Sequence, residues 1–241
     1  MAVAHAHFLG GINSLRKEIA MPAKHLPIIG VPILERTHLE RASEHIELAI
    51  DDVMASLPTP EQLSAHERRG IIARYTAVLE GNFIYWMTAT YLSVSSVEAH
   101  EIIKDNLLQE VRDNHPGMLR RFAIAARANP TDVDRMAIHQ ELQAVRAFVA
   151  RLARLQLILM MAFFEGFIQR FMPYLADLAA RQESHETEYT DVHSVVDIAH
   201  TQGLLTAFAS ELDLEKEPVS SATLYEGVEV LHSLIRTIIR P

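Results

Sequence analysis

The sequence contains no cysteine among its 241 residues. This absence excludes disulfide bonds, zinc sites built from thiolates, and thiol nucleophiles. Disulfides persist mainly in oxidising compartments, so a chain without cysteine fits the cytoplasmic location that we expect.

Glycine and proline are scarce as well, with 9 and 10 residues respectively. Long stretches with helical periodicity run between them, and we find neither an internal repeat nor a credible strand pattern. A chain of this length can form one large domain with a sizeable core, and a second domain is not required. The sequence therefore predicts an all-α, single-domain bundle of seven or eight helices over residues 1–241.

The expected helices follow from apolar spacing and from residues that begin or end helices. Thr59 is the expected N-cap of the second large helix, with Pro60 at the first helical position. Ser96 is the expected N-cap of the next helix, and Pro116-Gly117 kinks or restarts a later one. The expected helices span 9–20, 37–57, 60–91, 98–113, 118–128, 132–181 with a bend near Pro173, 191–212 and 220–239, with an irregular connector over 25–32.

A basic tract is also missing, and the formal net charge is −9, which argues against nucleic acid as a partner. The most apolar run, 155–164, ends at Glu165 and is too short to span a membrane. Residues 1–11 lack the basic start and long apolar run of a signal peptide. The expected partner is a small-molecule substrate, with a homodimer left open and no membrane or nucleic acid.

Three ligand-type residues share one face of the helix expected over 191–212. His193, Asp197 and His200 have i, i+4, i+7 spacing and fall within about 60° of one another around a helix. Apolar residues flank this polar stripe, which favours half of a metal site over a solvated face.

Acidic residues that interrupt apolar runs are candidates for the other half, since a lone carboxylate there is costly. Glu165 lies in an apolar run with no cation within four residues on either side. A buried protonated or hydrogen-bonded carboxyl is the alternative. Glu80 is a weaker candidate of the same kind.

Glu110 and His115 form a third element ahead of Pro116. A regular helix would separate residues five apart by about 140°, so spacing alone favours a surface helix end. An irregularity before the proline would bring both side chains to one site. The sequence also contains two Glu-x-x-His pairs of the kind found in ferritin-like di-iron bundles, Glu35 with His38 and Glu229 with His232.

With these residues in order, the chain resembles the haem-oxygenase-like di-iron oxidases and oxygenases, whose fold relatives include the CADD-like proteins, the TenA thiaminases and PqqC. The third-helix motif His-x-x-x-Asp-x-x-His of that superfamily is complete as His193, Asp197 and His200. The second-helix Glu matches Glu165, and the first-helix pair matches Glu110 and His115. The resemblance covers roughly residues 70–212. Within the single domain we expect N-terminal helices and a connector over 1–60, a metal-binding core over 61–212 and a C-terminal helix over 213–241.

The resemblance further implies an enzyme, a non-haem di-iron oxidoreductase that uses O2 as co-substrate. Two Fe ions, or an Fe/Mn pair, would be held by Glu110, His115, Glu165, His193, Asp197 and His200. Glu80 resembles an additional carboxylate ligand of some N-oxygenating members. Family chemistry implies oxidative C–C cleavage or N-oxygenation of a small acyl-chain, amino-acid or amine substrate.

An apolar wall around Glu165 would suit an apolar portion of that substrate, although plain core packing is the alternative. The wall residues are Leu157, Met160, Met161, Phe164 and Phe167. A substrate carboxylate would need an arginine, and the candidates are Arg120, Arg121, Arg127, Arg151 and Arg154. Two rival functions remain open at this stage, a metal-free helical binding protein and a cofactorless oxidase of the PqqC type.

Overall fold

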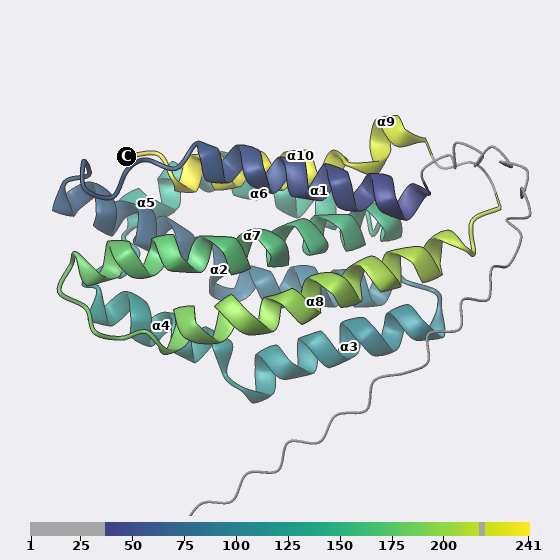
Figure 1. The fold of residues 1–241 in the computed structure, drawn as a ribbon, viewed down its shortest axis with the longest axis horizontal. Coiled ribbons are helices and arrows are strands. Elements are labelled where there is room, and N and C mark those ends of the chain that lie inside the picture. The colour runs from purple at the N-terminus through teal and green to yellow at the C-terminus, as the bar shows by residue number, and fades with distance from the viewer. Residues whose placement is uncertain (1–36, 217–219) are drawn as a thin grey trace, which may run out of the picture. The chain divides into compact units, whose positions relative to one another are not determined.

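The computed structural model describes residues 37–216 and 220–241, and this part of the chain is all-α, without a strand (Figure 1). The helices are α1 (His38–Ala55), α2 (Ala65–Ser93), α3 (Val97–Arg112), α4 (His115–Ala125), α5 (Asp132–Ala137), α6 (His139–Val149), α7 (Arg154–Ala180), α8 (Glu188–Leu212), α9 (Ser221–Leu224) and α10 (Glu226–Ile238). Because α5 and α9 are short, eight helices of eleven or more residues build the bundle, which confirms the predicted class. The helix expected over 9–20 and the connector over 25–32 lie outside the described residues.

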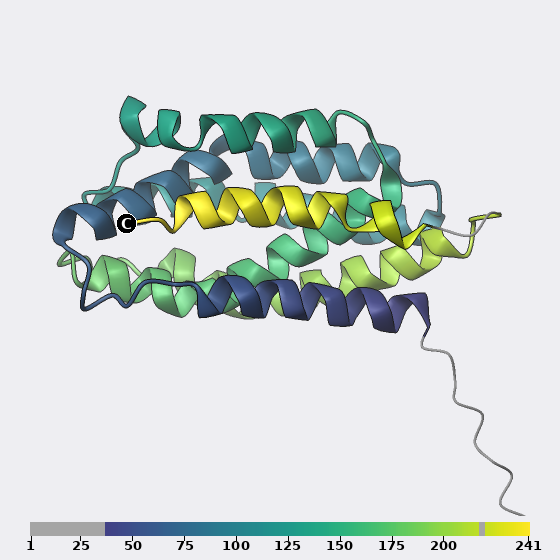
Figure 2. The same ribbon diagram turned by 90° about the horizontal axis from the view of Figure 1, so that it is seen from above.

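The central helix of the bundle is α7, which packs against α1, α2, α8 and α10. Figures 1 and 2 show α1, α10 and α6 side by side on one face of it. On the other face α8 lies between α7 and α3, so a side chain of α8 can reach both (Figure 1). By length and composition α7 could cross a membrane, but 83% of its most apolar window is buried inside the bundle.

A kink interrupts α2 at Glu80 and Gly81. Gly81 has a φ of 80°, a conformation that glycine adopts without a steric penalty. The Asn82 side-chain amide donates to the Val78 carbonyl at 2.7 Å and accepts from Arg146 of α6. These bonds compensate for the helix hydrogen bonds that the kink disrupts.

A second irregularity separates α3 from α4. Asn114 adopts a left-handed conformation with φ 55° and ψ 44°, which Asn tolerates better than most residues. Its side chain packs on Gly117, where a Cβ would collide with the amide group. The chain therefore turns sharply between Glu110 and His115, as the hypothesis of an irregularity before Pro116 requires.

The largest differences from the predicted boundaries lie at the start of α2 and within residues 132–181. The N-cap of α2 is Ser64, in a capping box with Glu67, so the predicted start at Thr59 and Pro60 is wrong. The predicted long helix over 132–181 is wrong as well, because it is broken into α5, α6 and α7. Leu152, with a φ of 51°, lies in the break between α6 and α7.

Candidate metal centre

The six residues predicted from the third-helix motif and its partners converge on one region of the bundle. They form two groups of three, in each of which one potential ligand atom per residue lies within 4.8 Å of the others. All six side chains are buried. The first group is Glu110, His115 and His193, and the second is Glu165, Asp197 and His200.

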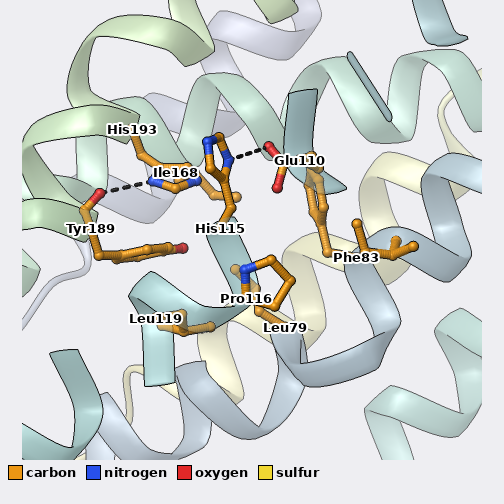
Figure 3. Close-up of a pocket in the computed structure, with 10 residues that line it drawn as sticks. Leu79, Phe83, Glu110, His115, Pro116, Leu119, Ile168, Tyr189 and His193 are labelled. Carbon is orange, nitrogen blue, oxygen red and sulfur yellow. Dashed lines mark hydrogen bonds and ion pairs between the residues drawn. The ribbon is translucent and has the colours of Figure 1, made fainter. Parts of the chain in front are cut away.

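In the first group, the end of α3, the start of α4 and the N-terminal part of α8 meet. His115 donates from Nδ1 to Oε1 of Glu110 at 2.8 Å, and its Nε2 is buried without a hydrogen-bond partner. His193 donates from Nδ1 to the carbonyl of Tyr189 at 2.8 Å, which leaves Nε2 unprotonated. The two imidazole rings lie 4.5 Å apart, edge to face (Figure 3).

In the second group, α7 contributes Glu165 and α8 contributes Asp197 and His200. His200 Nδ1 lies 3.5 Å from Glu165 Oε1 and 3.9 Å from Asp197 Oδ1. Both carboxylate oxygens of Asp197, Oε1 of Glu165 and Nδ1 of His200 are buried without a hydrogen-bond partner. Buried polar atoms are normally bonded, so these four atoms face a position that a ligand would satisfy.

The electrostatics of the two groups also favour a bound cation. Burial raises the pKa of Asp197 well above its usual range, and the charges of Glu165 and Glu110 add to this effect. Burial likewise raises the pKa of Glu165. No lysine or arginine forms an ion pair with these three carboxylates in the described part of the chain. Three buried carboxylates without such a partner are costly unless a cation neutralises them.

The pKa values of His193 and His200 shift in opposite directions. Burial lowers the pKa of His193 to about 4, so its imidazole is neutral at pH 7 and can act as a ligand without losing a proton. For His200, burial alone would lower the pKa, but the Glu165 carboxylate outweighs burial and raises it.

Comparison with known proteins agrees with this donor set. Residues 73–231 match a family described as iron-containing redox enzymes, and the match includes all six residues. The chain belongs to this family. It is therefore an oxidoreductase with the haem-oxygenase-like fold, and the resemblance inferred from the sequence is confirmed. A search of curated proteins gave no match.

Glu80 lies outside both groups of candidate metal ligands. Its side chain, at the kink of α2, is 42% exposed, and its Oε1 lies 2.7 Å from Nη2 of Arg120. Arg135 approaches the same carboxylate at 3.8 Å. The predicted additional ligand is thus held by two arginines in this structure, and the two candidate metal groups do not include it.

The rival Glu-x-x-His pairs do not form a site in the described residues. Glu35 is not described, and His232 of the second pair bonds through Nε2 to Asp52 at 2.8 Å. Arg236 donates to the same carboxylate oxygen of Asp52. Among the described residues, neither His38 nor His232 belongs to a group of candidate metal ligands.

A narrow pocket, with a cavity volume of about 20 Å³, lies beside the first group (Figure 3). We call it the inner pocket, and its lining residues are Leu79, Phe83, Ile84, Glu110, His115, Pro116, Leu119, Ile168, Tyr189 and His193. The wall predicted on α7 is buried core instead, and α7 contributes only Ile168 to this lining. The apolar lining thus comes mainly from α4 and from the two sides of the kink in α2, where Leu79 and Phe83 lie.

The five arginines proposed for a substrate carboxylate all pair with glutamates. Arg120 pairs with Glu80, Arg121 with Glu188, Arg127 with Glu183, Arg151 with Glu226, and Arg154 with Glu211 and Glu215. Only Arg120 lies next to a hollow that adjoins the inner pocket.

Two residues near the ligand groups had no signal in the sequence. Gln109 accepts a hydrogen bond from His200 Nε2 at 2.9 Å, and Tyr189 lines the inner pocket with its ring 4.2 Å from that of His193. The Tyr189 hydroxyl bonds to the buried Tyr75 hydroxyl at 2.7 Å. Their roles depend on contacts between helices far apart in the chain, so a pattern along one helix could not reveal them.

Proposed function

We propose that the protein is a non-haem di-iron enzyme that uses O2 to oxidise a small organic substrate. The observation that carries the proposal is the pair of buried three-residue groups with unsatisfied ligand atoms. In this proposal Glu110, His115 and His193 hold one iron, and Glu165, Asp197 and His200 hold the other. An Fe/Mn pair is the alternative for the same oxygen and imidazole donors.

The donor set fits iron in type and in charge. Two histidines with one carboxylate, as in the first group, are the ligands of many Fe(II) oxygenases. Three carboxylates carry −3 when ionised, which offsets most of the +4 charge of two divalent ions. When bound, the iron pair would supply O2 binding and the electrons needed to reduce it.

The chain's own residues orient the ligands and the substrate. The Tyr189 carbonyl fixes Nε2 of His193 as the free ring nitrogen, and Gln109 fixes Nδ1 of His200. The inner pocket presents Leu79, Phe83 and other apolar side chains beside Glu110. An apolar portion of the substrate there would exclude water from the ligands. The reaction that we propose, on the resemblance to the family, is C–C cleavage or N-oxygenation of an acyl-chain, amino-acid or amine compound.

Metal counting on protein prepared anaerobically with Fe(II) tests the proposal. We expect two metal ions per chain, O2 consumption by the loaded protein and a transient visible absorption band after mixing. Asp197→Ala and His193→Ala should each lower the iron stoichiometry while the helical circular dichroism stays unchanged. The control is Asp191→Ala, since Asp191 is exposed on the same helix and its carboxylate accepts a hydrogen bond from the Thr187 hydroxyl, outside both groups.

Less than one iron per chain, or iron loading without O2 consumption, would contradict the proposal. Unchanged iron loading in Asp197→Ala would contradict the role of α8. Either result would favour the rival functions, a metal-free binding protein or a cofactorless oxidase.

A further inference from the structure

A second hollow lies at the surface next to the inner pocket. Its cavity volume is about 250 Å³, and we call it the outer hollow. Three residues, Leu79, Pro116 and Leu119, line both spaces. In Figure 3 these three lie together on the side of the inner pocket away from His193 and Glu110. The outer hollow therefore adjoins the inner pocket on the side remote from the candidate metal ligands.

The outer hollow is apolar at its base and charged at its rim. Ala123 and Ile124 extend the apolar lining along α4. The only charged residues that line it are Glu80, Arg120 and Arg135, so the lining has a net charge of +1. An apolar lining with a few charged groups is typical of a small-molecule site.

The two arginines come from different helices and meet at one carboxylate. Arg120 belongs to α4 and Arg135 to α5, while Glu80 lies at the kink of α2. Arg135 also donates to the Pro130 carbonyl at 2.9 Å and lies 4.0 Å from Asp132. The guanidinium groups of Arg120 and Arg135 thus both bind the Glu80 carboxylate at the rim of this hollow.

We propose that the outer hollow binds the carboxylate of an amphipathic substrate through Arg120 and Arg135, while the apolar body of that substrate extends past Leu79 and Leu119 into the inner pocket. The substrate carboxylate would take the place of Glu80 on the arginines. The inference rests on the proposed function, because it names the substrate class of the same site. It places the oxidised position at the apolar end, away from the carboxylate.

Glu80 is suited to such a displacement. Its ion pairs with Arg120 and Arg135 are exposed, and exposed pairs contribute little to stability. Arginine binds planar carboxylates with two donors, so a substrate carboxylate would be recognised in the same manner as Glu80. The other candidate arginines pair with glutamates outside the lining of this hollow.

Isothermal titration calorimetry on the metal-free, full-length protein tests the inference. The probes are 4-phenylbutyrate and 4-phenylbutan-1-ol, which share the apolar body and differ in the charged group. The double variant Arg120→Gln, Arg135→Gln should bind phenylbutyrate about five- to tenfold more weakly and leave the affinity for the alcohol within about twofold. Arg127→Gln is the matched control, because Arg127 pairs with Glu183 and does not line the hollow.

Two further variants test the competition and the connection between the spaces. Glu80→Gln should bind phenylbutyrate about threefold more tightly, since the competing carboxylate is gone. Phe83→Leu, in the inner pocket alone, should weaken both probes by the same factor. The inference would be overturned if the wild type did not bind phenylbutyrate. It would also be overturned if the affinity for phenylbutyrate did not change in the double arginine variant or in Phe83→Leu. Because no metal is present in these titrations, a failure of iron loading in a separate preparation leaves their result intact.

Discussion

The Nε2 atom of His200 lies 2.9 Å from the side-chain oxygen of Gln109, a contact between α8 and α3. This bond assigns the ring hydrogen to Nε2 and leaves Nδ1 facing Glu165 and Asp197. His193, two turns earlier on the same helix, has the opposite tautomer, since its Nδ1 donates to the Tyr189 carbonyl. The two histidines of α8 therefore present different nitrogens to the two groups.

Replacing Gln109 by Leu should weaken iron binding at the second group by about tenfold, because the hydrogen bond that orients the His200 ring is lost. Gln109→Glu keeps an acceptor and should retain most of the affinity. Chelator competition for Fe(II) measures the change. Gln202→Leu is the control, since Gln202 is an exposed residue of α8, the helix that carries His200. Equal iron affinity in Gln109→Leu and the wild type would show that Gln109 does not position His200.

Replacing Asn114 by Val should separate Glu110 from His115. The left-handed conformation at Asn114 costs a β-branched residue about 1–2 kcal/mol more, so the junction between α3 and α4 should relax to another geometry. We expect loss of one iron per chain, from the first group, with the second group still loaded. Asn114→Gly tolerates the conformation and should keep both ions. Metal counting distinguishes these outcomes, and equal loss in both variants would point to the Asn side chain instead.

This junction marks the limit of what the sequence could predict about the site. His193, Asp197 and His200 share a face by helical periodicity alone, and Glu165 is conspicuous in its apolar run. Glu110 and His115 are five residues apart, and only the turn at Asn114 brings them together. Nothing in residue spacing specifies that turn. The prediction that Glu110 and His115 are ligands therefore depends on the resemblance to the family.

The wrong helix boundaries have similar physical causes. Leu152 takes a positive φ in the break before α7, although leucine gives no signal for it, and packing between helices decides the conformation. The start of α2 was readable, because Ser64 and Glu67 form a capping box three residues apart. Pro60 offers a competing start signal, because proline is common at the first helical position. The inner pocket combines α2, α4, α7 and α8, so its lining could not follow from any single helix.

Replacing Glu211 by Ala should destabilise the bundle at the start of α3. Glu211 is fully buried and accepts hydrogen bonds from the backbone N–H groups of Ser95 and Ser96 at 2.6 and 2.5 Å. It also lies 3.1 Å from Nε of Arg154. We expect a loss of about 3 kcal/mol in unfolding free energy, since the variant leaves the backbone N–H groups of Ser95 and Ser96 without their acceptor and removes one of the two carboxylates that pair with Arg154.

Glu215 provides a matched control for this change. It pairs with the same Arg154, at 2.6 Å, but is partly exposed. Glu215→Ala should cost at most about 1 kcal/mol. Denaturant titration measures both values, and similar losses in the two variants would mean that the bonds to Ser95 and Ser96 contribute little.

Asp134 should give the bundle part of its resistance to acid. Burial alone would raise the pKa of Asp134, but hydrogen bonds from Arg69 and Thr131 outweigh it and lower the pKa to about 2, from 3.8. A carboxyl with a lower pKa in the folded state stabilises the fold above its unfolded pKa, and this contribution disappears as the pH falls through the folded pKa. Asp134→Asn should therefore lose about 2 kcal/mol at pH 7, and its deficit relative to the wild type should shrink between about pH 4 and pH 2. Denaturant titrations across this range, with the exposed Asp132→Asn as control, measure the deficit. A deficit that stays constant with pH would mean that the charge of Asp134 does not contribute.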